Sequence, residues 1–162
     1  MEQGNWNVDE MLHWLDIKID REDRNIREQS KKMNENFLHF FAWNAESLYK
    51  SHFMSGCYNI LRKAVDGAKG MDTVWNIVED NIAYCENKLL NGQVDCNSSS
   101  RTTNVAHFLK LECMQQLVRD YREFANILAQ TPPEENLQQA TSKTEKKREE
   151  PPKKKMNSGI RR

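Results

Sequence analysis

The chain has 162 residues, 30% of them charged, and contains only six glycines and four prolines. This length suits one ordinary domain with an appended segment, and the composition favours helices over a β-sandwich or barrel. No apolar run approaches the roughly 18 residues of a membrane span. The first residues, MEQGNWNVDEML, lack the basic and apolar regions of a secretory signal. We therefore expect a cytoplasmic protein with no membrane partner.

The formal net charge of zero conceals two segments of opposite sign. Residues 1–130 hold 15 Lys and Arg against 19 Asp and Glu, which gives a net charge of −4. Residues 131–162 hold 9 against 5, which gives +4. This partition predicts a helical domain over residues 1–130 and a separate basic tail over residues 131–162.

The first predicted element is one long helix over residues 8–54, capped by Asn7 with Glu10 completing a capping box. Many of its apolar residues share one helical phase, and five of them lie seven residues apart: Leu12, Ile19, Ile26, Met33 and Phe40. Residues 20–36 are otherwise polar, with opposite charges four residues apart. Such a centre is either exposed to solvent or covered by one other helix. A break near residues 30–36 is the alternative to a continuous helix.

Six of the fourteen aromatic residues lie within residues 37–53, FLHFFAWNAESLYKSHF. Phe37, Phe40, Phe41 and Leu48 fall on the apolar phase of the first helix, so we expect most of this aromatic density in the core.

Two tryptophans and a histidine lie off that apolar phase. Trp43 and His39 project from the opposite side, and Trp14, 29 residues earlier, points in nearly the same direction as Trp43. Shorter helices could cover this flank, or it could be a contact surface for another subunit or partner, where Trp is enriched. The predicted interface consists of Trp14, Ile26, Met33, His39 and Trp43 and predicts a homo-oligomer or an obligate partner.

Three further helices are predicted beyond a change of phase at Ser55-Gly56. They are a short helix over residues 57–66, a helix capped by Asp72 that ends at Asn91-Gly92, and a helix over residues 104–130. No useful β-alternation occurs. The predicted fold is therefore an all-α helical bundle with one long N-terminal helix, three further helices and a disordered C-terminal tail.

The tail has no aromatic and almost no aliphatic residues, so it cannot bury enough surface to offset the entropy of ordering. Its basic clusters are Lys146, Lys147, Arg148, Lys153, Lys154 and Lys155. These side chains could contact nucleic acid through phosphates, or an acidic protein surface, or they could simply keep the tail solvated. In a eukaryote, the run PPKKK would also favour nuclear import.

No metal site or cofactor is predicted. The four cysteines, Cys57, Cys85, Cys96 and Cys113, form no CxxC pair and are expected to be free thiols. Glu10 and His13 have the Glu-x-x-His spacing of di-iron bundles, but the chain contains no second pair of this kind.

Arg101-Thr-Thr-Asn-Val-Ala-His107 has an Arg-x5-His form that resembles the RxxxxH-type motif of HEPN ribonucleases. The resemblance covers seven residues, and Thr102 stands where that family favours another kind of polar residue. It implies a small all-helical domain in which Arg101 and His107 would act together on the RNA phosphodiester, usually across a dimer.

The patterns together favour a non-enzymatic, all-α protein-protein interaction or assembly protein, with self-association through the long first helix as one form of it. The alternative is a small HEPN-like, metal-independent ribonuclease that uses the Arg101/His107 pair.

Overall fold

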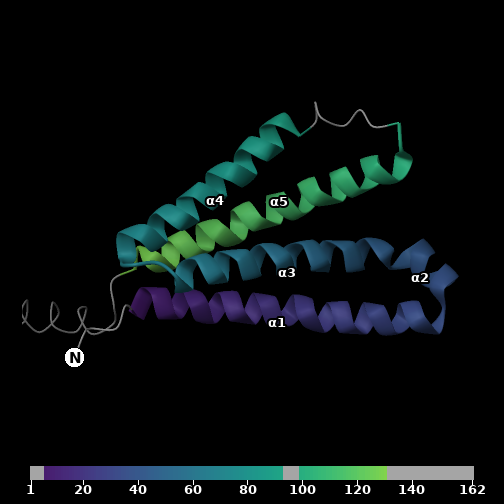
Figure 1. Ribbon diagram of the computed structural model, residues 1–162, viewed down its shortest axis with the longest axis horizontal. Helices are drawn as coiled ribbons and strands as arrows, with labels where there is room; N and C mark the ends of the chain where they lie inside the picture. Colours follow the sequence, from purple (N-terminus) through teal and green to yellow (C-terminus); the bar gives the residue numbers. More distant parts are fainter. Residues whose placement is uncertain (1–5, 93–98, 131–162) are drawn as a thin grey trace, which may run out of the picture. The chain divides into compact units, whose positions relative to one another are not determined.

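The computed structural model describes residues 6–92 and 99–130, which form five α-helices and, within these ranges, no β-strand (Figure 1). The helices are α1 (Trp6–Glu35), α2 (Phe37–Trp43), α3 (Ala45–Asp66), α4 (Met71–Asn91) and α5 (Arg101–Leu128). The predicted all-α fold is confirmed. None of these helices is both long enough and apolar enough to cross a membrane. The predicted tail lies outside the described residues.

The helices form two antiparallel pairs. α1 runs along α3, and α4 runs along α5; these are the two most extensive helix contacts. α5 also contacts α1 and α3, which joins the two pairs. α2 lies at the turn where the chain leaves α1 and returns as α3 (Figure 1). Short connections between helices produce such antiparallel neighbours.

The prediction of one helix over residues 8–54 is wrong, and its alternative, a break near residues 30–36, is correct. Asn36 has an extended backbone (φ −153°, ψ 92°), and its side chain accepts a hydrogen bond from the His39 N–H at 3.1 Å. A milder break follows at Asn44 (φ −126°, ψ −11°). Asn favours helix caps because its short amide competes with backbone hydrogen bonds. Periodicity alone does not detect breaks of one residue.

The separate short helix predicted over residues 57–66 is also wrong, because α3 continues through Ser55-Gly56 to Asp66 without a break. Ser55 is buried, and its hydroxyl donates to Asp23 Oδ1 on α1 at 2.8 Å. Gly56 is exposed, so its missing side chain leaves no cavity. The positions of the apolar residues shift here because the side of α3 that faces α1 carries serines as well as apolar side chains.

The last two predicted helices are present with slightly different starts. α4 begins at Met71 after Gly70, whose φ of +100° is a conformation that glycine adopts without steric strain. α5 begins at Arg101, three residues earlier than expected, because Ser100 caps it by accepting a hydrogen bond from the Thr103 N–H at 3.4 Å.

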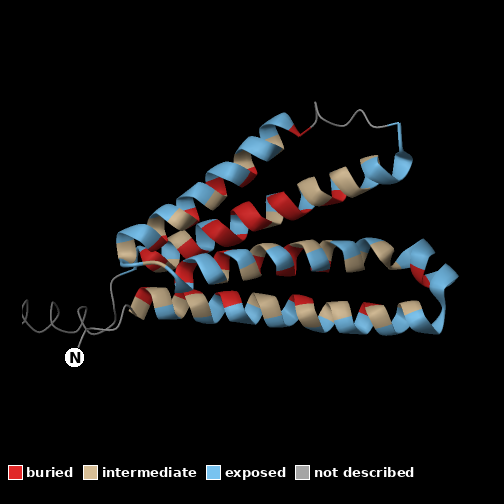
Figure 2. Cartoon of the chain, viewed as in Figure 1, coloured by how far each residue is buried: buried red, intermediate tan, exposed pale blue. Residues whose placement is uncertain are grey.

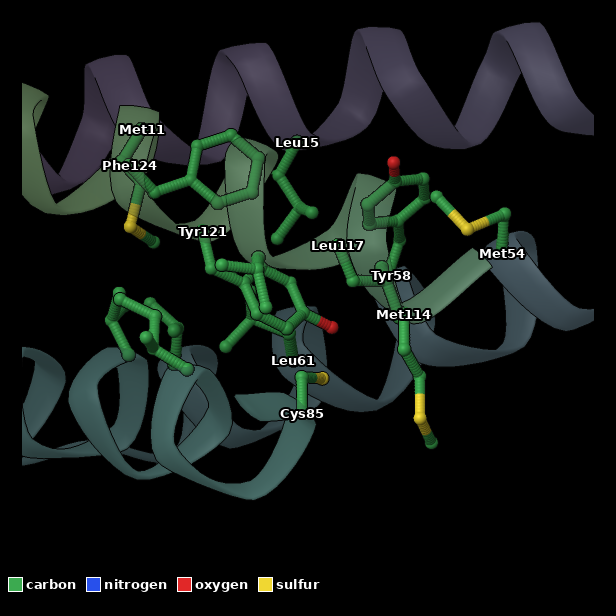
Figure 3. Packing of buried hydrophobic residues seen from close by; sticks show 14 of the residues in the cluster. Met11, Leu15, Met54, Tyr58, Leu61, Cys85, Met114, Leu117, Tyr121 and Phe124 are labelled. Carbon is green, nitrogen blue, oxygen red and sulfur yellow. The ribbon is translucent and has the colours of Figure 1, made fainter. Parts of the chain in front are cut away.

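The main core lies where α1, α3, α4 and α5 meet (Figure 3). Each helix contributes apolar side chains at helical spacing, and the largest that are fully buried are Met11, Leu15, Tyr58, Leu61, Leu117, Tyr121 and Phe124. An apolar stripe at helical spacing on α5 is buried from Cys113 to Leu128: Cys113, Met114, Leu117, Tyr121, Phe124 and Leu128. α5 therefore supplies the central layer of the bundle, which Figure 2 shows as its densest run of buried residues.

The contact between α1 and α3 has a polar centre, which we call the polar seam: Asn25, Gln29, Ser47 and Ser51. Asn25 Nδ2 donates to Ser51 Oγ at 2.6 Å and Ser47 Oγ at 3.3 Å, and Gln29 Nε2 donates to Asn25 Oδ1 at 3.3 Å. Gln29 Oε1 is buried without a hydrogen-bond partner. One other helix thus covers the polar middle of the N-terminal segment, and an unsatisfied acceptor there reduces the gain from pairing.

A buried carboxylate, Asp120, joins α5 to α1 and α3. Its Oδ1 lies 2.7 Å from Lys18 Nζ and accepts from Gln116 Nε2 at 2.9 Å, and its Oδ2 accepts a hydrogen bond from the Tyr58 hydroxyl. Burial, with the hydrogen bond to Asp120, raises the pKa of Tyr58 far above its usual value, so Tyr58 stays a donor. Both carboxylate oxygens are therefore satisfied, as a buried charge requires.

Replacing Asp120 should destabilise the fold strongly. Asp120→Asn leaves the Lys18 ammonium, itself largely buried, without its closest countercharge, and should lower the free energy of unfolding by about 3 kcal/mol or more. Glu123 is the matched control, because it pairs with the same lysine at 3.5 Å but is two-thirds exposed. Glu123→Gln should change stability by less than about 1 kcal/mol in urea unfolding. Equal effects of the two changes would contradict this role for Asp120.

Two glycines should respond oppositely to substitution by alanine. A Cβ at Gly92 would lie 2.5 Å from the Leu111 side chain and 2.6 Å from the Lys88 carbonyl oxygen, so Gly92→Ala should lower the free energy of unfolding by about 1–3 kcal/mol. A Cβ at Gly56, inside α3, meets nothing within 4 Å. Gly56→Ala should therefore stabilise by about 0.5–1 kcal/mol. Stabilisation by Gly92→Ala would show that α4 and α5 do not approach this closely.

Candidate interaction surface

The helix α2 presents four large apolar side chains to solvent, which we call the α2 patch: Phe37, Leu38, Phe41 and Trp43. Their exposed fractions are 59%, 80%, 66% and 77%. The rings of Phe37 and Phe41, one helical turn apart, stack with centroids 6.0 Å apart. Figure 2 shows α2 almost wholly exposed, at the end of the α1–α3 pair. A concentration of exposed apolar groups of this kind is typical of a contact surface.

The expectation that Phe37 and Phe41 lie in the core is therefore wrong, while Phe40 is buried as predicted. The reason is the break at Asn36, which turns α2 away from the direction of α1. In addition, the sequence FLHFFAW places apolar residues on every side of a short helix, so only one side can pack inward. This all-round apolarity next to a capping Asn is the signal that could have revealed the surface.

The predicted interface residues occupy separate places. Trp43 belongs to the α2 patch, whereas Trp14 lies on the first half of α1, 45% exposed, with its Nε1 donating to Glu10 Oε1 at 2.9 Å. Because the break at Asn36 places Trp14 on α1 and Trp43 on α2, the single helix on which their common direction was predicted does not exist. They do not share a flank.

The other three predicted interface residues lie on the second half of α1 and on α2. Ile26 and Met33 are half-buried on α1, and His39 is exposed on α2. A hollow of about 330 Å³ lies at this bend; it is lined by Lys32, Glu35, Asn36, His39, Phe40 and Asn44. α2 is thus loosely packed around its single buried ring.

A larger hollow, of about 630 Å³, lies between α1, α3 and α5. Its lining is mixed in charge: Arg21, Glu22, Lys50, Met54, Glu112, Cys113, Gln115, Gln116 and Arg119. Arg21 pairs with Glu22 at 2.9 Å and Lys50 with Glu112 at 2.7 Å, so neighbouring charges largely neutralise each other. Burial raises the pKa of the Cys113 thiol to about 11, which keeps it protonated and weakly nucleophilic at neutral pH.

Arg101 and His107 do not converge within the chain. Both lie in the first two turns of α5, where residues six positions apart point about 120° from each other. Arg101 is exposed, whereas His107 Nε2 lies 2.7 Å from the Gly92 carbonyl oxygen at the end of α4. His107 therefore holds the end of α4 against α5.

Only some of the remaining candidate metal ligands, thiols and basic residues lie in the part of the chain that the structure describes. Glu10 is hydrogen-bonded to Trp14. Across residues 6–92 and 99–130, no three His, Cys, Asp or Glu side chains are grouped so as to hold a metal ion. Cys57, Cys85 and Cys113 form no disulfide, and Cys96 lies outside the described residues, as do the basic clusters of the tail.

Comparison with known proteins assigns no family to this chain. No family model, curated protein or solved structure matches it. Within the described residues, the α2 patch is the surface feature that most needs a physical explanation.

Proposed function

We propose that this chain is a non-enzymatic interaction or assembly protein that binds a protein partner through the α2 patch. The observation that carries the proposal is the exposure of Phe37, Leu38, Phe41 and Trp43 on one seven-residue helix. Keeping such side chains in water forgoes roughly 1.5–3 kcal/mol of burial free energy for each. A partner that covers them recovers this free energy.

The patch has the composition of an interface centre. Phe and Trp are enriched in interface centres, and Trp is prominent among the residues that dominate binding energy. The stacked rings of Phe37 and Phe41 already restrain each other, so less side-chain entropy is lost when a partner binds. A polar rim is present as well, since Lys31 and Glu35, both exposed, form an ion pair one turn before the patch.

The test is to remove the patch without altering the fold. Phe41→Ser/Trp43→Ser should weaken association at least tenfold, because each substitution removes a large apolar anchor, while leaving the helical circular dichroism and the melting temperature unchanged. Association would be measured by light scattering of the purified chain, and by pull-down of the full chain and of residues 1–130 with identification of the bound protein.

Ile60→Ser is the matched control, because Ile60 is 68% exposed on α3, outside the patch. It should leave association unchanged. Association that weakens equally in the Ile60 variant, or that persists in the double variant, would show that the α2 patch is not the binding surface.

A further inference from the structure

We propose that the partner of the α2 patch is a second copy of this chain, and that two copies bind by straightening α1, α2 and α3 into one helix and exchanging α1. This inference rests on the proposed function of the α2 patch and adds to it the identity of the partner and the way in which it binds. Domain swapping of this kind reuses the contacts of the monomer and is a low-cost route to a dimer.

α1, α2 and α3 are separated by single residues, Asn36 and Asn44. Neighbouring helices share the break residue in their backbone hydrogen bonds: Asn36 N donates to Lys32 O and Asn36 O accepts from Phe40 N, and Asn44 N donates to Phe40 O and Asn44 O accepts from Leu48 N, at 2.7–3.2 Å. To continue the helix, Asn36 must change both φ, from −153° to about −63°, and ψ, from 92° to about −42°, whereas Asn44 mainly needs a change in φ. The straightened helix, residues 6–66, would be about 90 Å long.

A stripe that is apolar except at Ser47 runs through both breaks. The seven-residue spacing of the first helix continues from α1 through α2 into α3: Leu12, Ile19, Ile26, Met33, Phe40, Ser47, Met54 and Leu61. Met54 and Leu61 are buried in the core. A sustained seven-residue apolar repeat is the pattern with which long helices pair with each other. Within the bent chain no single helix uses the whole of this repeat.

The contacts of α1 with α3 are in a register that is centred on α2. Asn25 faces Ser51, Asp23 faces Ser55, and Asp16 pairs with Arg62 at 2.6 Å. The midpoint of each pair is residue 38 or 39, within α2. Two straightened helices in antiparallel orientation can therefore keep all these contacts between copies, with their twofold axis passing through α2.

This arrangement places the α2 segment of one copy beside that of the other. Phe37 and Phe41, which are exposed in the bent chain, then gain apolar neighbours across the axis. The exchanged α1 would carry Met11, Leu15 and Lys18 into the partner's core, so that the Lys18–Asp120 ion pair forms between copies with unchanged geometry. The dimer thus retains the core of the monomer and adds the burial of the α2 patch.

The bent form is also incompletely packed where it would have to open. The polar seam contains the unsatisfied Gln29 Oε1, and the hollow at the bend is lined by both hinge residues, Asn36 and Asn44. At the bend, opening therefore breaks contacts that are weaker than those of the apolar core, and the core contacts of Met11, Leu15 and Lys18 that it also breaks form again between copies.

Hinge variants test the straightening. In Phe37→Pro, the ring of proline suits the first position of α2 and confines Asn36 to the extended conformation it already has, but is incompatible with the interior of a continuous helix. It should raise the dimer dissociation constant at least about 100-fold relative to Phe37→Ala, which removes the same aromatic ring. Asn36→Ala removes the cap and favours the straight helix, so it should lower that constant roughly tenfold.

Cross-linking tests the exchange. In the double variant Asn25→Cys/Ser51→Cys, the two thiols face each other across the α1–α3 contact. Monomer and dimer fractions would be separated by size exclusion, oxidised, and run on a non-reducing denaturing gel beside wild type treated identically. The dimer fraction should yield a covalent dimer and the monomer fraction a single chain with an internal disulfide.

The outcomes separate this inference from the proposed function. A dimer fraction that gives only internally cross-linked single chains, or equal effects of Phe37→Pro and Phe37→Ala, would mean that intact hairpins dock through α2; exchange would be refuted while the interaction surface stands. A chain that stays monomeric at millimolar concentration even as Asn36→Ala would refute self-association. If it then also bound no protein through the α2 patch, the proposed function would fail as well.

Discussion

The arrangement of this bundle depends on the extended backbone of one residue, Asn36. Had this residue been helical, α1 and α2 would have formed one rod, and the polar stretch in the middle of α1 would have needed a separate partner. Because Asn36 caps α2 instead, and Asn44 completes the turn, α3 returns along α1 and supplies that partner from the same chain. The cap contributes only about 1 kcal/mol. It therefore decides between two ways of covering the same face of α1, by α3 of the same chain or by a separate partner.

The returning α3 accounts for the pattern of polar and apolar contacts elsewhere. Its serines match Asn25 and Asp23 on α1, while Tyr58 and Leu61 reach the layer formed by α5. Asp120 then connects all three helices through Lys18 and Tyr58. A buried charge with several partners disfavours other packings, because any shift of one helix would leave part of the network unpaired. The core therefore specifies how α5 sits against the α1–α3 pair.

The α2 patch is the consequence of making a tight turn from an apolar segment. Seven residues that are apolar on all sides can bury only one of them, Phe40, and the rest remain in solvent. An exposed surface of this kind is either covered in an assembly or a liability for aggregation. The same bend that gives the monomer its α1–α3 contact thus creates the surface through which we propose that it associates.

The candidate site could be predicted only in part. Trp43 and His39 were expected either under shorter helices or on a contact surface and are exposed, whereas Phe37 and Phe41 were expected in the core and are also exposed. Periodicity predicts which residues face the core by assuming that the helix continues. One extended residue makes that prediction invalid for all residues after it in the same helix. Arg101 and His107 have the spacing of a known motif, yet about 120° of helix separates their directions, and His107 contacts the carbonyl of Gly92.

By itself, the sequence determined the all-α class, the position of α4 and α5 to within a few residues, and the apolar stripe of α5, because these follow from local capping and from a 3.6-residue repeat within one helix. Only the tertiary structure decided that α3 runs unbroken through Ser55-Gly56, that Asp120 is buried with Lys18 and Tyr58, and that α2 is exposed. Each of these depends on a partner far away in the chain. Local preferences differ there by about 1 kcal/mol, which contacts between helices readily outweigh.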